Sequence, residues 1–147
     1  GYEHALPDDP LPDCVSHNRS VMRPHGVWIV IAPFNFPLAL AAGPVAAALV
    51  TGNTVVLKGS TDTPWAGRLL ADCIRDAALP PGVFNYLSGS GSDVGAALTA
   101  HPATAGVTFT GSVGVGMRLV RQMATGAWPR STCASWTQRP SRTRSRS

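Results

Sequence analysis

The chain has 147 residues, of which 44% are hydrophobic and 14% charged, so it carries enough apolar sequence for one folded domain and is not expected to be disordered throughout. The formal charge is +4, but four arginines among residues 131–147 account for all of it, and residues 1–130 are neutral. This distribution excludes a basic body of the kind that binds nucleic acid specifically.

Strand-like and helix-like patterns alternate along the chain. Residues 1–25 contain four prolines and predict an extended lead-in. Within residues 26–124, four short β-rich runs are each followed by a helical stretch. The predicted strands and helices span residues 26–32, 38–50, 54–58, 63–79, 82–89, 92–101, 106–111 and 112–124. Neither period continues beyond these, and we expect residues 125–147, rich in Ser, Thr and Arg, to form a disordered tail, either natural or translated out of frame.

This alternation predicts an α/β fold, namely a Rossmann-like parallel sheet with helices on both faces. The most apolar stretch, residues 27–50, is interrupted by three prolines, which favours a buried strand and helix and no membrane span. Ligands of such sheets bind beyond the carboxyl ends of the strands. Polar or glycine-rich stretches follow all four predicted strands: APFNFP (32–37), LKGST (57–61), SGSGSDVG (88–95) and FTGSVGVG (109–116). The sequence therefore predicts one ligand site along this edge.

The cysteines and histidines favour a reducing, cytoplasmic setting and no metal site. The three cysteines are odd in number and form no C-x-x-C pair, so a disulfide framework is not expected. The four histidines lie in the lead-in or after a helix and form no pair with metal-ligand spacing. The first ten residues are polar and proline-rich, unlike a secretory signal.

Three residues at this edge each have a structural and a functional interpretation. The glycines of FTGSVGVG are spaced G-x-x-G-x-G, unlike the common dinucleotide fingerprint, so Ser112 either caps a helix or helps to hold an anion. Asn35 lies between prolines and is expected to be rigid and buried, either closing a turn or donating its amide to an oxyanion. Lys58, the only lysine, either extends into solvent or holds a ribose or phosphate.

Taken together, these stretches resemble the NAD(P)-binding domain of the aldehyde dehydrogenase superfamily. APFNFP resembles the family signature P-W-N-F-P, with Phe34 in place of Trp, and GNTVVLK resembles its G-N-x-V-V-x-K strand. PPGVFNYLSGSGSDVG is similar to P-x-G-V-x-N-x-x-x-G-x-G-x-x-x-G, and FTGSVGVG is similar to F-T-G-S-T-x-x-G. The resemblance covers residues 23–123 and leans toward the branch that acts on glutamate semialdehyde, the pyrroline-5-carboxylate dehydrogenases.

The resemblance implies an enzyme that oxidises an aldehyde to a carboxylic acid with NAD or NADP. Asn35 would donate its amide N–H to the oxyanion that forms when a cysteine thiolate attacks the aldehyde. Lys58 would bind the adenosine ribose, and the small Thr61 would leave room for a 2′-phosphate, so that both cofactors are accepted. The cofactor-binding residues implied by the resemblance are Ile31, Pro33, Phe34, Lys58, Thr61, Gly91, Gly95, Phe109, Gly111, Ser112 and Val115.

Two motifs of this family do not occur among the 147 residues. The G-Q-x-C context of the catalytic cysteine is absent, and so is the E-x-G-G-K context of the general base. The resemblance therefore implies a fragment, inactive by itself, of a longer homo-oligomeric enzyme. A non-catalytic nucleotide-binding module and an inactive remnant are the alternatives, and the sequence leaves open the aldehyde, the choice between NAD and NADP, and the oligomeric state of the chain.

Overall fold

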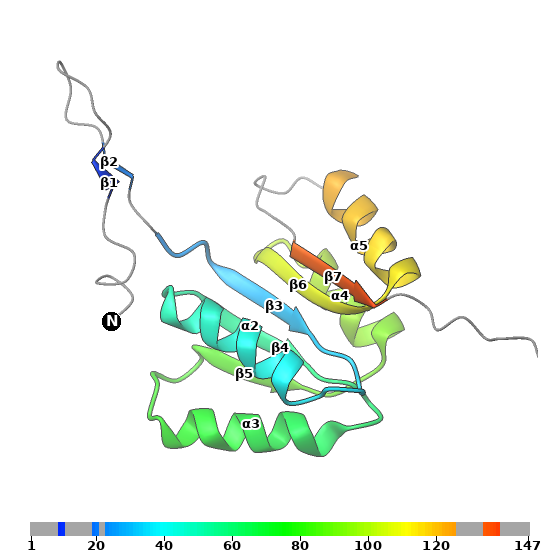
Figure 1. Cartoon of the computed structure of the whole chain (residues 1–147), viewed down its shortest axis with the longest axis horizontal. Helices are drawn as coiled ribbons and strands as arrows, with labels where there is room; N and C mark the ends of the chain where they lie inside the picture. The colour runs from blue at the N-terminus through cyan, green and yellow to red at the C-terminus, as the bar shows by residue number, and fades with distance from the viewer. Residues whose placement is uncertain (1–8, 11–18, 21–22, 126–133, 139–147) are drawn as a thin grey trace, which may run out of the picture.

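Five parallel strands form the sheet at the centre of the structure (Figure 1). The computed structural model describes residues 9–10, 19–20, 23–125 and 134–138. The sheet has the order β5-β4-β3-β6-β7. Its strands are β3 (Val27–Ile31), β4 (Thr54–Lys58), β5 (Phe84–Leu87), β6 (Thr104–Ser112) and β7 (Ala134–Gln138). A separate antiparallel pair is formed by β1 (Asp9–Pro10) and β2 (Arg19–Ser20).

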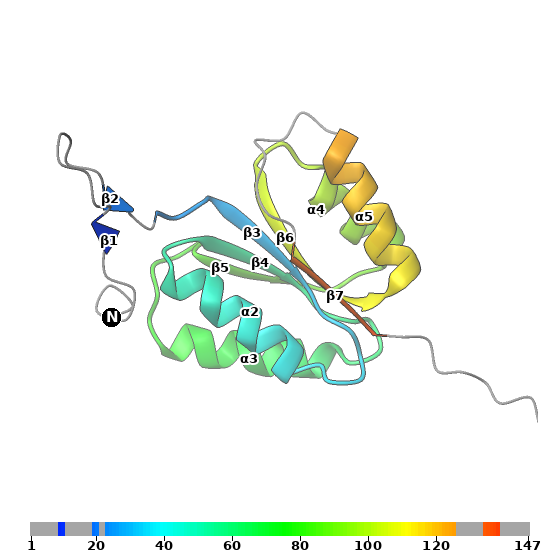
Figure 2. The same ribbon diagram turned by 45° about the horizontal axis from the view of Figure 1, so that its top comes forward.

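The helices lie on both faces of this sheet (Figure 2). One face is covered by α2 (Ala39–Val50) and α3 (Pro64–Asp76), and the other by α4 (Ala96–Ala100) and α5 (Val113–Thr125). A π-helical turn, η1 (Gly91–Gly95), leads into α4. The predicted Rossmann-like α/β fold is therefore confirmed. Among the described residues, none of the helices has both the length and the apolar character that crossing a bilayer requires.

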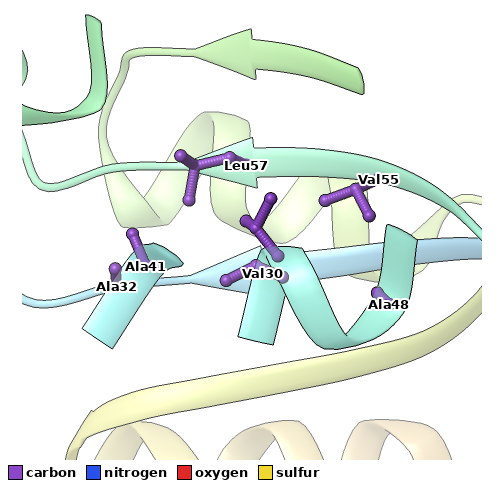
Figure 3. Packing of buried hydrophobic residues seen from close by; sticks show 7 residues of the cluster. Val30, Ala32, Ala41, Ala48, Val55 and Leu57 are labelled. Carbon is purple, nitrogen blue, oxygen red and sulfur yellow. The ribbon is translucent and has the colours of Figure 1, made fainter. Parts of the chain in front are cut away.

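Successive side chains of the strands pack alternately into two hydrophobic clusters, one on each face of the sheet, as expected for a parallel sheet covered on both faces. The cluster beneath α2 and α3 comprises Val30, Ala32, Ala41, Val45, Ala48, Val55 and Leu57 (Figure 3). The cluster beneath α4 and α5 comprises Ile29, Val107, Phe109 and Leu119. Neighbouring residues of one strand thus pack into different clusters. The same alternation determines on which face of the sheet each side chain at a strand end lies.

Helix α3 is shorter than the sequence predicts. The expected helix spans residues 63–79, but the structure ends it at Asp76. Ala78 takes a φ of 52°, in the left-handed region that a helix cannot continue through, and its N–H donates to the Arg75 carbonyl at 3.0 Å. The hydrophobic period of the helix continues through Ala77 and Ala78, so the sequence pattern alone did not reveal where α3 ends.

Strand β7 is a departure from the expected disordered tail. Residues Ala134–Gln138 pair in parallel with Thr108–Ser112 of β6, so the prediction is wrong for these five residues. An open strand edge offers N–H and C=O groups to any extended segment, whatever the hydrophobic period of that segment. The other residues of the expected tail beyond Thr125, and residues 1–8, 11–18 and 21–22 of the expected lead-in, lie outside the described part of the chain.

The order of the strands reverses beside β3. From β3 the chain adds β4 and then β5 on one side, and it then returns to place β6 on the other side of β3. Helix α2 leaves β3 toward one face and α5 leaves β6 toward the opposite face (Figure 2). The carboxyl ends of β3 and β6 therefore flank a topological switch point, where open parallel sheets bind their ligands.

Candidate functional site

Four side chains form a row across the carboxyl ends of the strands. Ile31 of β3 pairs in register with Lys58 of β4 and with Phe109 of β6, and Lys58 pairs with Leu87 of β5. Ile31 and Phe109 contribute to the cluster beneath α4 and α5, as does Val56, two residues before Lys58, so the row lies on this face of the sheet. The register thus brings together three residues that the sequence proposed separately.

Lys58 is buried rather than extended into solvent. Only 7% of this residue is exposed, which excludes the interpretation of Lys58 as an ordinary surface lysine. Burial lowers the pKa of its amino group below the usual value, and the attraction of the Asp62 carboxylate opposes that effect. Its carbonyl accepts a hydrogen bond from the Ala32 N–H at 3.2 Å, which ties the loop after β3 to the end of β4. A buried cation therefore lies at the expected ligand edge.

The first turn of α5 has the character of an anion site. The Ser112 hydroxyl accepts a hydrogen bond from the Val115 N–H at 3.4 Å, so Ser112 does act as a cap. This turn contains no acidic residue. A Cβ built at Gly114 would meet nothing within 4 Å, so open space lies beside the turn. Helix N-termini present N–H groups without intrahelical partners and favour negative charge. Ser112 can cap the helix and still leave other N–H groups of this turn for an anion.

Phe109 and Gly111 owe their positions to packing. Phe109 is 5% exposed and packs with Leu119 in the cluster beneath α5, with Val115 beside it. A Cβ at Gly111 would lie 2.6 Å from Cζ of Phe109, so the ring occupies the space that any side chain at 111 would need. The glycine of FTGS is therefore required by the core, in addition to any contact with a ligand.

The loop after β3 is more exposed than the sequence suggested. Ile31 and Pro33 are half-buried, but Phe34 is 60% exposed. Asn35 is also exposed, and the expectation that it is buried is wrong. The loop connects the carboxyl end of β3 to the start of α2, at the end of the sheet where the ligand edge lies (Figure 1). Asn35 therefore lies at the surface of the ligand edge and not inside the core.

The remaining predicted residues follow β4 and β5. Thr61 is exposed in the turn after Lys58. In η1, Gly91 is exposed and a Cβ there would meet nothing within 4 Å, whereas Gly95 is buried and its N–H donates to the Ser90 carbonyl at 3.2 Å. Thr61 thus lies in the loop after β4, and the two glycines lie in the helical turn that follows β5.

Sequence reasoning missed three polar residues at this edge. The Ser90 hydroxyl accepts from the Asp93 N–H at 3.0 Å and donates to the Asp93 carboxylate at 2.7 Å, capping η1. The Ser-x-x-Asp pattern could have revealed this cap. Asp62 was also missed, although it lies four residues after the only lysine of the chain.

Two hollows lie away from this edge. One, of about 430 Å³, is bounded by α3, residues 79–82 and β5, and a second, of about 300 Å³, lies between Trp28, Thr108 and α2. Both are on the side of the sheet covered by α2 and α3. The placement of the candidate site therefore depends on strand register and on the switch point and not on either of these hollows.

The chain is similar to known proteins along most of its length. Residues 8–133 match the model of the aldehyde dehydrogenase family. The 1-pyrroline-5-carboxylate dehydrogenase of Geobacillus thermodenitrificans is 49% identical over 107 residues, which cover 73% of this chain and 21% of that protein. A second 1-pyrroline-5-carboxylate dehydrogenase, from Bacillus cytotoxicus, is 44% identical over 110 residues, which are 75% of this chain and 21% of that protein. The chain thus spans about a fifth of the length of these relatives.

Solved structures with the same fold were also found. An aldehyde dehydrogenase variant from Bacillus cereus matches with a TM-score of 0.85 and 31% identity, over 92% of this chain and 27% of that one. A Proline Utilization A variant from Bradyrhizobium japonicum matches with a TM-score of 0.82 and 38% identity, over 88% of this chain and 13% of that one. Sequence and fold agree on the same group of proteins.

Proposed function

This chain belongs to the aldehyde dehydrogenase family, and from that premise we propose that it forms the cofactor-binding part of an NAD(P)-dependent enzyme that oxidises glutamate semialdehyde to glutamate. The relatives named 1-pyrroline-5-carboxylate dehydrogenase, at 44–49% identity, support this substrate. The likeness to Proline Utilization A, at 38% identity, points to the same branch. The cytoplasmic location expected from the cysteines stays a prediction.

The observation that carries the proposal is that Lys58 and the start of α5 lie at the same edge of the sheet, on strands β4 and β6 that flank β3 beside the switch point. A dinucleotide needs a partner for a ribose and donors for a pyrophosphate, and the edge offers a buried cation and a helix N-terminus free of acids. Open space beside Gly114 leaves room for the phosphates. The residues present therefore fit the cofactor, which supplies the hydride acceptor of the reaction.

Asn35 is the proposed catalytic residue of this chain. Its exposed amide can donate an N–H to the oxyanion that develops when a thiolate adds to an aldehyde. Pro33 and Pro37, on either side of Asn35 within APFNFP, stiffen the loop, so that the donor is held in place before charge develops. Ile31 and Pro33 lie just before it and would line the path of the cofactor.

The isolated chain is expected to bind nucleotide without turning over aldehyde, because the family contexts for the nucleophile and the general base are absent from its 147 residues. The alternative of an inactive remnant draws support from exposed aromatic side chains near the ligand edge: Phe34 (60%), Phe36 (64%) and Trp65 (70%). Such a surface favours aggregation over binding.

A titration of the 147-residue chain with NADH, followed by nicotinamide fluorescence and calorimetry, separates these two possibilities. We expect saturable binding that Lys58→Met weakens at least about tenfold, since a charged hydrogen bond is lost. Arg23→Gln, which removes one cation from an exposed position before β3, should leave binding unchanged. Failure of the wild-type chain to bind NADH while it remains folded would refute the proposal and favour the remnant.

A further inference from the structure

The ring of Tyr86 lies between two glycines from other elements. Tyr86, in β5, packs against the cluster beneath α2 and α3. A Cβ built at Gly59 would lie 3.2 Å from Cε2 of this ring, and a Cβ built at Gly67 would lie 2.7 Å from its Cζ. Neither glycine has a positive φ, so the backbone does not require glycine at these positions. Gly67 even lies inside α3, where alanine is the more stable residue, so contact with the ring accounts for both glycines.

Tyr86 is also hydrogen-bonded to the start of α3. Its hydroxyl donates to the Pro64 carbonyl at 2.8 Å, across 22 positions of the chain. Pro64 is the first residue of α3, and Gly59 directly follows Lys58 at the end of β4. One side chain of β5 therefore holds both ends of the loop formed by residues 59–63.

The loop itself is closed by local hydrogen bonds. The Asp62 N–H donates to the Ser60 hydroxyl at 3.2 Å, and the Thr63 N–H donates to the Ser60 carbonyl at 3.4 Å. Bonds between near neighbours fix the shape of a turn but not its position against the sheet. The contact with Tyr86 supplies that position, because it joins the loop to a different strand.

The tyrosine ring lies on the opposite face of the sheet from a ligand bound at Lys58. Tyr86 pairs in register with Leu57, which belongs to the cluster beneath α2 and α3. Side chains alternate along a strand, so Lys58 lies, like Val56, on the face covered by α4 and α5. A nucleotide bound at Lys58 would not touch the ring, and any effect of Tyr86 on its affinity would pass through residues 59–63.

We propose that Tyr86 is a positioning residue of the nucleotide site, which holds residues 59–63, and with them Lys58 and Thr61, in place before a ligand binds. A segment that is already ordered has little ordering entropy left to lose when the ligand arrives, so its contacts count more fully toward affinity. Loss of the ring leaves the loop tied to the sheet only through β4 and α3, the elements that it connects. This inference rests on the proposed function, since it assumes that Lys58 and Thr61 face the adenosine ribose.

The test is calorimetric titration of the 147-residue chain with NADH and with ADP-ribose, which keeps the adenosine ribose and lacks the nicotinamide, at a temperature where every variant is folded. Tyr86→Leu removes the ring and should weaken both ligands by the same factor, about three- to tenfold. Tyr86→Phe keeps the ring between the glycines and should retain most of the affinity. Trp28→Phe, which removes a hydrogen bond between β3 and β6, is the matched control for lost stability and should leave both affinities unchanged.

A second variant tests the same contact from the helix. Gly67→Ala would push a methyl group into the ring and should weaken both ligands as Tyr86→Leu does, although alanine favours the helix. In the Tyr86→Leu chain, Gly67→Ala should cause no further loss of affinity. Unchanged affinities in Tyr86→Leu, or a loss for NADH without an equal loss for ADP-ribose, would overturn the inference while the proposed function stands. If the wild-type chain binds neither ligand, the proposed function fails, and the inference fails with it.

Discussion

Gly111→Ala tests whether packing against Phe109 fixes the glycine of FTGS. A Cβ at this position would lie 2.6 Å from Cζ of the Phe109 ring, which is 5% exposed and held among the side chains beneath α5. Overpacking of this kind costs about 1–3 kcal/mol of folding free energy. The φ of Gly111 is not positive, so the cost comes from the ring contact and not from the backbone.

The assay is urea unfolding of the nucleotide-free chain, which keeps ligand contacts out of the measurement. Gly111→Ala, Phe109→Leu and the double variant complete a double-mutant cycle, and the smaller leucine should relieve the clash. We expect a coupling of about 1–2 kcal/mol between the two sites. Gly114→Ala is the matched control, because nothing lies within 4 Å of a Cβ there, and it should leave α5 unchanged or stabilise it by about 0.5–1 kcal/mol. Additive effects of the two substitutions, within about 0.5 kcal/mol, would refute the packing argument.

Three further predictions concern stability, each measured by urea unfolding. Trp28→Phe should cost about 1 kcal/mol, because it removes the 2.7 Å hydrogen bond from Nε1 to the Thr108 hydroxyl, and an unchanged midpoint would contradict that bond. Asn53→Ala should lower the free energy of unfolding by about 2–3 kcal/mol, because Oδ1 of Asn53 accepts hydrogen bonds from the His25 and Gly26 N–H groups at 2.6 Å and 3.0 Å. Asn53→Asp keeps the acceptor oxygens and should lower it less. Equal losses for the two variants would count against this role of Oδ1. Burial holds the pKa of Lys58 in the folded chain below its usual value of 10.5, so the folded state releases this proton at a lower pH than the unfolded state does. The wild-type chain should therefore gain stability relative to Lys58→Met as the pH rises toward 10.5. A stability difference between the two chains that does not change with pH would argue against burial of the charge.

In the enzyme that we propose, other parts of the active site would meet this chain at the ligand edge. Lys58 and the first turn of α5 face an open edge, and Asn35 and Phe34 project beyond it. A catalytic thiolate and a cover for the nicotinamide would have to approach from this side. The exposed aromatic residues at the edge are therefore suited to burial against another part of a longer protein, as sheet-edge ligand sites commonly lie between domains.

Local sequence determined the elements and the edge at which the chemistry gathers. Strand and helix periods are properties of neighbouring residues, so β3, β4 and β5 lie within the predicted ranges and the polar stretches fall at their carboxyl ends. Where a helix stops depends on single backbone angles, and the left-handed Ala78 shortened α3 without changing the pattern. The place of Lys58 at a strand end followed from sequence, but its burial did not.

Only the tertiary structure decided which strands are neighbours and therefore which residues share the site. Ile31 lies between Lys58 and Phe109 because β6 returns to the far side of β3, and no local period contains that choice. The same holds for β7, whose pairing uses backbone groups of β6. Burial of Phe109 and exposure of Asn35 both follow from this arrangement. Each depends on contacts between segments distant in the chain, whose energies the sequence pattern of one segment does not record.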